Sequence, residues 1–318
     1  MRLRLFGISS VFSDMQKKKL KRLTLIQMLS LGVSLMGLTQ ACENSQVLAP
    51  SRTQVDVAGV VSDSPSGPLP IESPSPEDRL PPEAPSQRSW SVDALLFAGS
   101  GTWAAEVSSL KSILSARGAS YIEVSSAELN AMTLEEISEF GVLIFPGGSG
   151  GTQAGSLSSS TKALLRQAVQ ERGVGYTGFC AGAFIAVAPT PAPGRDVVYG
   201  LGVAEGPVLD YYYLENQGVT AQMTLLQLAD GSTRDVLWYG GPVTPDQPGD
   251  VIARYPNGDA SISQLTSGAG LVVISGGHPG VPASSKSAFG LVDSDGLDYE
   301  LTWSMISAAM NHQRLPAD

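Results

Sequence analysis

From residue 90 onward, apolar and polar positions follow two alternating patterns. Short apolar runs bounded by glycine or polar residues predict buried strands, and between them apolar residues recur at helical spacing. The predicted strands of this part of the chain are 91–98, 121–124, 142–145 and 174–179, and the predicted helices are 102–117, 133–140 and 160–171. Strands that alternate with helices indicate a parallel sheet with helices on both faces.

After about residue 190 the pattern changes to shorter strands joined by turns. Residues 223–228 and 235–239 flank Asp230-Gly231 and predict one β-hairpin, and residues 251–255 and 260–265 predict another. A further buried strand at 270–275 and a closing helix at 297–313 complete the pattern. We therefore expect an α/β fold with a central, mostly parallel sheet and extra β-hairpins in its C-terminal half.

Residues 1–41 have the pattern of a secretory signal, with a basic stretch, an apolar run from Leu23 to Leu38 and a small residue before Cys42. The ending Leu-Thr-Gln-Ala-Cys resembles a bacterial lipoprotein signal, although Thr39 stands where such signals usually have leucine. An ordinary secretory peptide and an uncleaved anchor are the alternatives. We expect Cys42 to carry lipid, which anchors the protein in the bacterial cell envelope, on the periplasmic or extracellular side.

Residues 42–90 predict a disordered tether. Eight prolines fall between Pro65 and Pro85 among Ser, Glu and Gly, and large apolar side chains are few. Such a segment buries too little surface to offset the entropy lost on ordering. The folded domain is therefore expected to cover residues 91–318, with the preceding segment as a spacer from the membrane.

Composition argues against several kinds of partner. The formal charge is −10, and without residues 1–41 the chain has 13 basic and 29 acidic residues, or about −16. Nucleic acid requires a basic patch, so we do not expect it as a partner. The run Gly147–Gly151 is followed by neither the Gly-Lys-Ser/Thr of a phosphate-binding loop nor a Gly-x-Gly-x-x-Gly pattern. Two histidines and one available cysteine offer no metal-ligand cluster. We expect neither a cofactor nor a metal.

The segment Gly173–Ala188 holds the main candidate for chemistry. An apolar run ends at Phe179, Cys180 follows, and a small-residue run suited to a helix comes next. Glycines on either side give Gly-x-Cys-x-Gly, the pattern of a nucleophile elbow, in which a sharp strand-to-helix turn exposes one side chain. A thiol at a helix N-terminus also favours the reactive thiolate. The alternative is a buried structural cysteine in a glycine-rich packing site.

His278 is the candidate partner of Cys180. It follows the strand at 270–275, whereas the other histidine, His312, lies near the end of the last predicted helix. A cysteine nucleophile requires a base or an ion-pair partner within hydrogen-bond reach. If Cys42 is lipidated, Cys180 has no partner for an intramolecular disulfide, and a free thiol outside the cytoplasm then requires an explanation. The alternative for His278 is a role in the turn itself.

Three segments that follow strands are expected at one edge of the sheet. Gly99–Gly101, Pro146–Gly151 and Cys180 each come directly after a predicted strand. In open parallel sheets, sites form at the carboxyl ends of the strands. The pattern thus predicts that these segments share one site.

Motifs in these segments resemble the class I glutamine amidotransferase-like superfamily. They are Phe145-Pro-Gly-Gly148, Gly178-Phe-Cys-Ala-Gly182 and Gly277-His-Pro279, in this order. Trp238-Tyr-Gly-Gly-Pro242 and Gly206-Pro207 look like elements of the biotin–protein ligase N-terminal-domain family within it. The likeness covers about residues 92–313. It implies a flavodoxin-like three-layer sandwich with a nucleophile elbow.

The resemblance also implies residue roles. Cys180 would be the nucleophile, His278 its base, and the backbone N–H groups of Gly148 and Ala181 the oxyanion hole. The implied pocket residues are Gly147, Tyr211, Tyr212, Tyr213, Trp238, Tyr239, Gly240 and Gly241.

One position departs from the glutaminase pattern. Glutaminase-active members have a glutamate two places after the histidine, and this chain has Gly280 there. Asp293, Asp295 and Glu106 are the alternatives for an orienting acid from elsewhere. Two hypotheses follow: a membrane-tethered Cys–His amide or peptide hydrolase that acts through a thioester at Cys180, or a non-catalytic protein that binds a small-molecule or peptide ligand in the same pocket.

Overall fold

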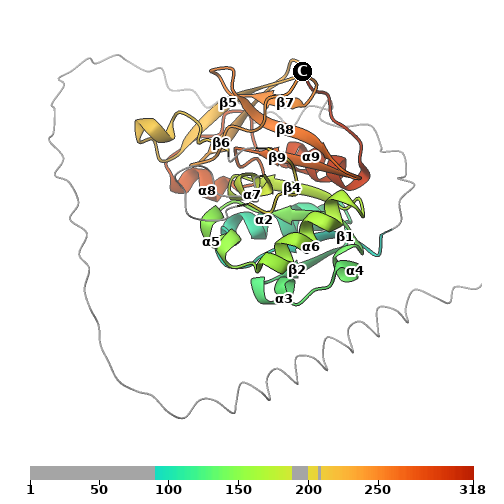
Figure 1. The fold of residues 1–318 in the computed structure, drawn as a ribbon. Helices are drawn as coiled ribbons and strands as arrows, with labels where there is room; N and C mark the ends of the chain where they lie inside the picture. The colour runs from blue at the N-terminus through green and yellow to red at the C-terminus, as the bar shows by residue number, and fades with distance from the viewer. Residues whose placement is uncertain (1–89, 188–199, 207–208) are drawn as a thin grey trace, which may run out of the picture. The chain divides into compact units, whose positions relative to one another are not determined.

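The computed structural model describes residues 90–187, 200–206 and 209–318 (Figure 1). The predicted signal at 1–41, including its apolar run, and the predicted tether up to residue 89 lie outside the described residues. Within the described ranges, no helix has both the length and the apolar character needed to cross a bilayer.

The elements follow the order that the sequence pattern predicts. The first part of the domain contains β1 (Val92–Phe97), α2 (Ala104–Ala116), β2 (Tyr121–Val124), α3 (Ser126–Asn130), α4 (Leu134–Ile137), β3 (Phe140–Phe145), α5 (Gly150–Gly155), α6 (Ser159–Gln170), β4 (Gly175–Phe179) and α7 (Ala181–Ala186). The second part contains the 3-10 helix η2 (Glu215–Gln217), β5 (Gln222–Leu228), β6 (Thr233–Trp238), β7 (Val251–Arg254), β8 (Ala260–Ser267), β9 (Gly270–Ser275), α8 (Ala283–Ala288) and α9 (Tyr299–Asn311).

The differences from the predicted elements involve short helices. The sequence pattern did not predict α3, α5 and α8, because helices of five or six residues are too short to show a period. The helix expected at 133–140 is the single turn α4, since Phe140 already begins β3. Its start is as expected: the Thr133 side chain caps the Glu136 N–H, and the Glu136 carboxylate accepts from the Thr133 N–H.

The described strands form one nine-stranded sheet in the order β2-β1-β3-β4-β9-β8-β7-β5-β6. The first five strands are parallel, and with β9 as the fifth they have the 2-1-3-4-5 order of flavodoxin-like folds. The two predicted hairpins, β5–β6 and β7–β8, extend the sheet beyond β9 with antiparallel strands. The predicted flavodoxin-like α/β fold with extra hairpins is confirmed.

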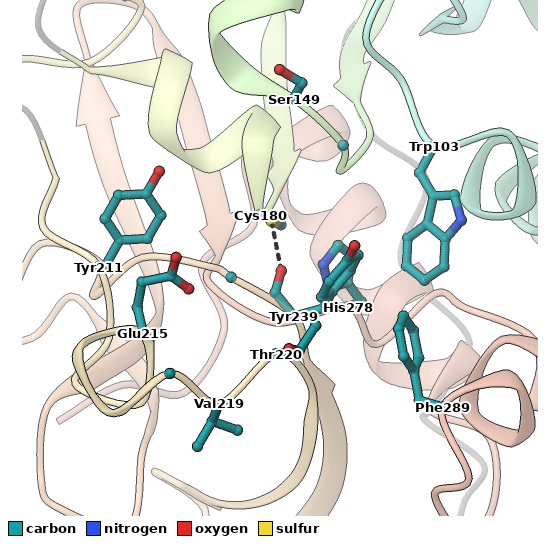
Figure 2. A pocket seen from close by; sticks show the side chains of 13 residues that line it. Trp103, Ser149, Cys180, Tyr211, Glu215, Val219, Thr220, Tyr239, His278 and Phe289 are labelled. Carbon is teal, nitrogen blue, oxygen red and sulfur yellow. Dashed lines mark hydrogen bonds between the residues drawn. The ribbon is translucent and has the colours of Figure 1, made fainter. Parts of the chain in front are cut away.

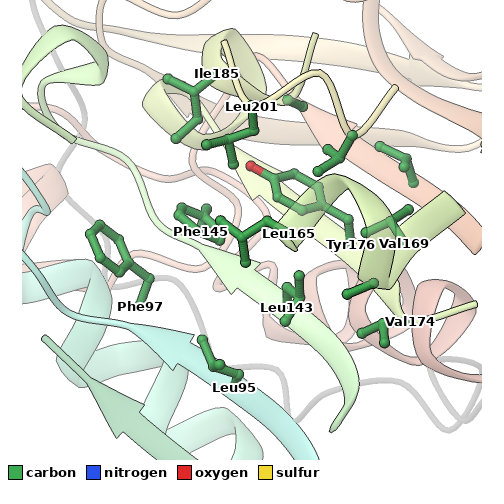
Figure 3. Packing of buried hydrophobic residues seen from close by; sticks show 14 of the residues in the cluster. Leu95, Phe97, Leu143, Phe145, Leu165, Val169, Val174, Tyr176, Ile185 and Leu201 are labelled. Carbon is green, nitrogen blue, oxygen red and sulfur yellow. The ribbon is translucent and has the colours of Figure 1, made fainter. Parts of the chain in front are cut away.

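Helices cover both faces of the parallel strands and so complete three layers (Figure 1). On one face, side chains of β1 and β3 pack with α6 and α7 in the cluster of Figure 3, which includes Leu95, Phe97, Leu143 and Phe145. On the other face, side chains of the same strands pack with α2 and α9, and these include Ala94, Leu96, Val142 and Ile144. Successive strand residues point to opposite faces, so a strand buried on both sides reads as a continuous apolar run.

The antiparallel strands curl back toward the end of β9. The backbone N–H of His278, just beyond β9, donates to the Leu237 carbonyl of β6 at 2.8 Å, although β6 is the last strand in the sheet order. The segment after β6 therefore lies beside the carboxyl end of β9. Parallel sheets form their sites at these strand ends.

Candidate active site

Cys180 lies at a sharp turn between β4 and α7. Its backbone has φ 46° and ψ −100°, a positive-φ conformation that is strained for a residue with a side chain. The Cys180 N–H donates to the Ser275 carbonyl of β9 at 2.8 Å, and the Phe184 N–H donates to the Cys180 carbonyl at 3.0 Å. This is the strand-to-helix turn that the Gly-x-Cys-x-Gly pattern predicts.

The glycines beside Cys180 allow close contact between backbone segments. A Cβ atom on Gly178 would lie 2.5 Å from the Gly182 carbonyl oxygen, and one on Gly182 would lie 2.0 Å from the Phe145 carbonyl oxygen. The buried Tyr176 hydroxyl donates to the Gly182 carbonyl at 2.8 Å. These contacts hold the first turn of α7 against β3 and β4, which fixes the position of Cys180.

The loops after β1 and β3 run side by side, as predicted for one edge of a parallel sheet. The Ser149 N–H donates to the Gly101 carbonyl, and the Trp103 N–H donates to the Gly147 carbonyl, both at 2.8 Å. Gly148 between them has φ 133°, and a Cβ atom there would lie 2.1 Å from the Gly101 carbonyl oxygen. A glycine is therefore required at position 148 by both conformation and space.

A buried carboxylate from α2 orients the ring of His278. Glu106 and His278 are both fully buried, and Glu106 Oε1 lies 3.1 Å from His278 Nδ1. The other carboxylate oxygen, Oε2, accepts the Gly147 N–H at 2.5 Å. With the backbone of His278 held by β6, this pair fixes both the position and the rotation of the imidazole.

Glu106 occupies the place of the acid that Gly280 lacks. Of the three alternatives raised by the sequence, it alone contacts His278 among the described residues. Asp293 binds the Lys286 ammonium, and Asp295 accepts the Asp235 N–H at 3.0 Å. A Cβ atom on Gly280 would lie 3.3 Å from Thr302 Cγ2, so the domain has little space for a side chain at that position.

The charge of Glu106 controls the protonation of His278. Burial lowers the pKa of His278, but the negative charges of Glu106 and of the Cys180 thiolate raise it by more, so this pKa lies well above its ordinary value. The imidazolium form is thus favoured near neutral pH. A protonated imidazole beside a cysteine favours the thiolate, which is the nucleophilic form.

The Cys180 thiol is free and interacts with both the Tyr239 carbonyl and the side chain of His278. It is the free cysteine among the described residues, and its Sγ donates to the Tyr239 carbonyl at 3.5 Å (Figure 2). His278 Nε2 is buried, and apart from the interaction of the ring with Cys180 it has no hydrogen-bond partner within the described part of the chain. Cys180 contributes to the raised pKa of His278, through its charge when it is ionised and through a hydrogen bond between the two side chains.

Two backbone N–H groups near the thiol have no acceptor among the described residues. Within the described ranges, neither the Gly148 N–H nor the Ala181 N–H donates a hydrogen bond. Gly148 shares a cavity of about 690 Å³ with Cys180 and His278, and Ala181 directly follows Cys180. Of the two residues, Gly148 lines the cavity and Ala181 lies behind it.

The cavity gathers many of the residues that the sequence singled out, but not all of them. Tyr211, Tyr239 and Gly240 line it, as expected (Figure 2). Gly147 and Gly241 do not. A Cβ atom on Gly147 would lie 2.4 Å from His278 Cε1, and one on Gly241 would lie 1.6 Å from the Gly276 carbonyl oxygen, so these glycines support the site from behind.

Two aromatic residues expected at the pocket belong to the core instead. Tyr212 and Trp238 are buried, Tyr212 stacks on Tyr255 with ring centroids 3.8 Å apart, and the Trp238 indole donates to the Gly241 carbonyl at 3.1 Å. Tyr213 is 40% exposed and packs edge-on against Tyr212, outside the cavity lining. Aromatic clusters in a sequence do not reveal which rings face a cavity.

The sequence missed several residues of the cavity wall. They include Trp103, Glu215, Thr220 and Phe289, whereas Ser149 belongs to the segment Pro146–Gly151 that was expected at the site. Trp103 packs edge-on against His278 at 5.2 Å between ring centroids, and Phe289 lies 4.9 Å from the Tyr239 ring. They come from loops and short elements, where no period marks a site. For Trp103 the sequence did offer one signal, because Trp103 comes soon after a predicted strand and the segment Gly99–Gly101 that follows it.

The remaining site predictions concern metals and the N-terminal cysteine. Among the described residues, no group of three His, Cys, Asp or Glu side chains could hold a metal ion. Cys42 and Pro207 lie outside the described residues. Gly206 is described and has φ 154°, within the range that favours glycine.

Comparisons with known proteins give similarities of structure only. No protein-family model and no curated protein sequence matches the chain. A solved structure of a glutamine amidotransferase is similar at 19% identity and a TM-score of 0.48, over 68% of this chain and 98% of that one. A ThuA-like protein from Bacteroides uniformis is similar at 13% identity and a TM-score of 0.42, over 70% and 93%. A beta-galactosidase from Bacillus circulans is similar at 10% identity and 0.41, over 70% of this chain and 31% of its own.

Proposed function

We propose that this protein is a cysteine-dependent amide or peptide hydrolase with an architecture of the class I glutamine amidotransferase-like kind. The observation that carries the proposal is the buried Glu106–His278 pair behind a free cysteine at a strained turn. Strain and buried charge both cost free energy, and they concentrate where chemistry requires them. In this proposal Cys180 is the nucleophile, His278 the acid and base, and Glu106 a positioning residue.

The proposed reaction has two steps. The Cys180 thiolate adds to the substrate carbonyl carbon, and the N–H groups of Gly148 and Ala181 stabilise the negative oxygen of the tetrahedral intermediate. The C–N bond then breaks, the leaving amine takes a proton from His278 Nε2, and a thioester remains on Cys180. Water next loses a proton to Nε2 and adds to the thioester carbonyl. Release of the carboxylic acid restores the thiolate and the imidazolium.

Glu106 lets His278 perform both proton transfers. Its carboxylate holds the Nδ1 proton, so Nε2 is the atom that gains and loses the other proton. The second oxygen of Glu106 is held by the Gly147 N–H, so the carboxylate cannot rotate freely away from the ring. For proton transfer, the Cys180 thiol has to turn its proton from the Tyr239 carbonyl toward His278. Rotation of the thiol proton is therefore part of the proposal, and apo sites commonly show such loose geometry.

The hydrogen bond from Cys180 to the Tyr239 carbonyl favours a second candidate, a non-catalytic protein that binds a ligand in this cavity. A thiol that stays bonded to the Tyr239 carbonyl would leave His278 Nε2 unused. The two candidates differ in one property. In the hydrolase, Cys180 is acylated and water then removes the acyl group, whereas in the binding protein Cys180 is never acylated.

The test is acylation of Cys180 by p-nitrophenyl acetate in the full chain with Cys42→Ala, which leaves Cys180 as its cysteine. We expect an acetyl thioester on Cys180 by intact-mass analysis, followed by steady release of acetate. His278→Ala should slow both acylation and release by roughly 10²-fold or more. Cys180→Ser and Glu135→Gln serve as negative and neutral controls. A thiol that is not acylated would reject the hydrolase and leave the binding protein.

The proposal includes a lipid anchor at Cys42 and a spacer over the residues that follow it. The support is the sequence pattern alone: a basic and apolar signal that ends in Leu-Thr-Gln-Ala-Cys, followed by eight prolines between Pro65 and Pro85. An extended segment of this kind spans about 3 Å per residue. The hydrolase domain would thus reach substrates in the envelope at a distance from its membrane.

A further inference from the structure

One wall of the cavity is acidic and aromatic. Glu215 of η2 is exposed, and its carboxylate points into the space between Tyr211 and Tyr239 (Figure 2). A Cβ atom on Gly240 would lie 3.7 Å from Glu215 Oε2, so the carboxylate sits beside the loop that carries Tyr239. A substrate that reaches Cys180 through this cavity therefore passes a negative charge.

The charge of Glu215 is not neutralised by the described part of the protein. Its carboxylate makes no hydrogen bond and no ion pair with any described residue. The described lining of the cavity contains no lysine and no arginine. Other surface carboxylates of the domain do have such partners: Asp246 binds Arg254 at 2.8 Å, and Glu123 binds Lys111 at 2.6 Å.

Aromatic rings complete the same part of the cavity. Tyr211 and Tyr239 are 42% and 40% exposed. Tyr211 packs on Phe184 at 4.8 Å, and Tyr239 packs on Phe289 at 4.9 Å, so each ring is supported from one side and open to the cavity on the other. Ring faces attract organic cations, and they do so more strongly beside a carboxylate.

We propose that Glu215, Tyr211 and Tyr239 form a subsite for an alkylammonium or guanidinium group, so that the protein selects amides or peptides with a cationic side chain. A small metal ion is a poor occupant, because the described residues contain no group of three His, Cys, Asp or Glu side chains that could hold one. An anionic side chain is disfavoured by the charge of Glu215 itself. Hydrolysis of the bound amide rests on the proposed function, whereas binding of the cation does not.

Binding is tested in the Cys180→Ala variant, which separates recognition from chemistry. The probes are the methylamides of Nα-acetyl-lysine, Nα-acetyl-norleucine and Nα-acetyl-glutamate, which differ in the charge at the end of the side chain. We expect isothermal titration to show the lysine probe binding roughly fivefold or more tightly than the norleucine probe, with weakest binding for glutamate. Added salt should reduce the lysine preference, because the carboxylate is exposed.

The matched variants are Glu215→Gln and Glu135→Gln, each made in the Cys180→Ala background. Both remove one exposed negative charge, but Glu135 lies on α4, outside the cavity lining. We expect the lysine preference to disappear in Glu215→Gln and to persist in Glu135→Gln. Equal affinities for lysine and norleucine probes, or an unchanged preference in Glu215→Gln, would overturn the subsite.

The two proposals fail in different ways. If the lysine probe binds selectively but Cys180 is never acylated in the otherwise unchanged chain, the cation subsite stands and the hydrolase is rejected. If Cys180 turns over activated esters and amides with no preference for cationic side chains, the hydrolase stands and the subsite is rejected. A lysine probe that fails to bind the Cys180→Ala variant also rejects the subsite.

Discussion

Glu106 Oε1 and His278 Nδ1 lie 3.1 Å apart in the interior of the domain, although the two residues are 172 positions apart in the sequence. One comes from the first turn of α2 and the other from the turn after β9. An ionised carboxylate inside a protein is costly unless it is paired and hydrogen-bonded. Glu106 meets both conditions through His278 and the Gly147 N–H. The pair connects the helix on one face of the sheet to the cavity at the strand ends.

Glu106→Gln should remove the charge while keeping the shape of the side chain. The charge of Glu106 raises the pKa of His278, so its loss lowers that pKa and makes the imidazolium beside Cys180 less favourable. We expect iodoacetamide to modify Cys180 more slowly between pH 6 and pH 7, and thioester turnover to fall by roughly 10²-fold or more.

The control for that substitution is Glu106→Asp, which keeps the charge with a shorter side chain. It should restore part of the alkylation rate at pH 6 if charge is what matters. A purely structural role for Glu106 predicts instead that Gln and Asp variants lose thermal stability but share the alkylation profile of the natural protein. Circular dichroism and the pH profile of alkylation, measured together, separate the two roles.

Two glycines four positions apart test how closely the site is packed. A Cβ atom on Gly147 would lie 2.4 Å from His278 Cε1 and 2.7 Å from Glu106 Oε2, whereas one on Gly151 in α5 meets nothing within 4 Å. We expect Gly147→Ala to displace the Glu106–His278 pair, to destabilise the domain by about 1–3 kcal/mol and to reduce acylation of Cys180.

Gly151→Ala is the matched control, because it adds the same methyl group to a neighbouring exposed position. It should leave acylation unchanged and stabilise the domain slightly, since alanine favours a helix by up to about 1 kcal/mol over glycine. Chemical denaturation and the acylation assay would measure both effects. Equal loss of activity in the two variants would mean that this segment tolerates no added methyl group. Contact of the new methyl group with Glu106 and His278 would then not explain the loss.

The sequence predicted the fold well because the parallel strands are short and buried on both faces. The run 142–145 and the run 270–275 have no polar residue until their ends, so each is recognisable without its neighbours. The two hairpins were predicted by their turn residues. What the pattern could not give is that the hairpin strands join the same sheet and curl until Leu237 meets His278. That contact depends on the twist of the whole sheet.

The candidate site was predicted in part for the same reason. Cys180 and His278 each follow a buried strand, and this position identified both as candidate site residues. Glu106 is the one acidic residue of its predicted helix, and its sequence neighbours do not show that it is buried or that it reaches His278. Glu215 lies in a short 3-10 turn with no period at all. Residues that reach a site from a helix face or a loop can be identified as site residues only when the tertiary structure is known.

Cys42 gives a prediction that depends on the sequence pattern rather than on the described domain. If Cys42 carries lipid, the full chain expressed in a bacterium should partition with membranes and enter the detergent phase of Triton X-114. Cys42→Ser should move the protein to the soluble fraction, because a chain that has lost its signal and carries no lipid has no anchor in the bilayer. Cys180→Ser is the matched control and should partition like the natural chain. Membrane association that survives Cys42→Ser would point to an uncleaved anchor.

Asp298 at the start of α9 should make the stability of the domain depend on pH. Burial raises the pKa of Asp298 to about 7, against the opposing charge of Lys286. Because the folded state binds this proton more tightly than the unfolded chain, the stabilisation is complete below about pH 4 and is lost as pH rises through 7. Asn at this position cannot ionise and should not show the loss.

We therefore expect the free energy of unfolding of the natural chain, relative to that of Asp298→Asn, to fall by roughly 1–4 kcal/mol between pH 4 and pH 8. Urea denaturation at several pH values measures the difference directly. Asp230→Asn is a suitable control, because Asp230 is an exposed turn residue whose pKa is lowered by its hydrogen bonds to Ser232. Its effect belongs to the acid range, below about pH 4. A constant difference between the natural chain and Asp298→Asn across pH 4 to 8 would show that Lys286 keeps Asp298 ionised throughout. Lys286, Asp293 and Asp298 would then act as a fixed ion cluster that anchors the segment carrying Phe289 to the cavity wall.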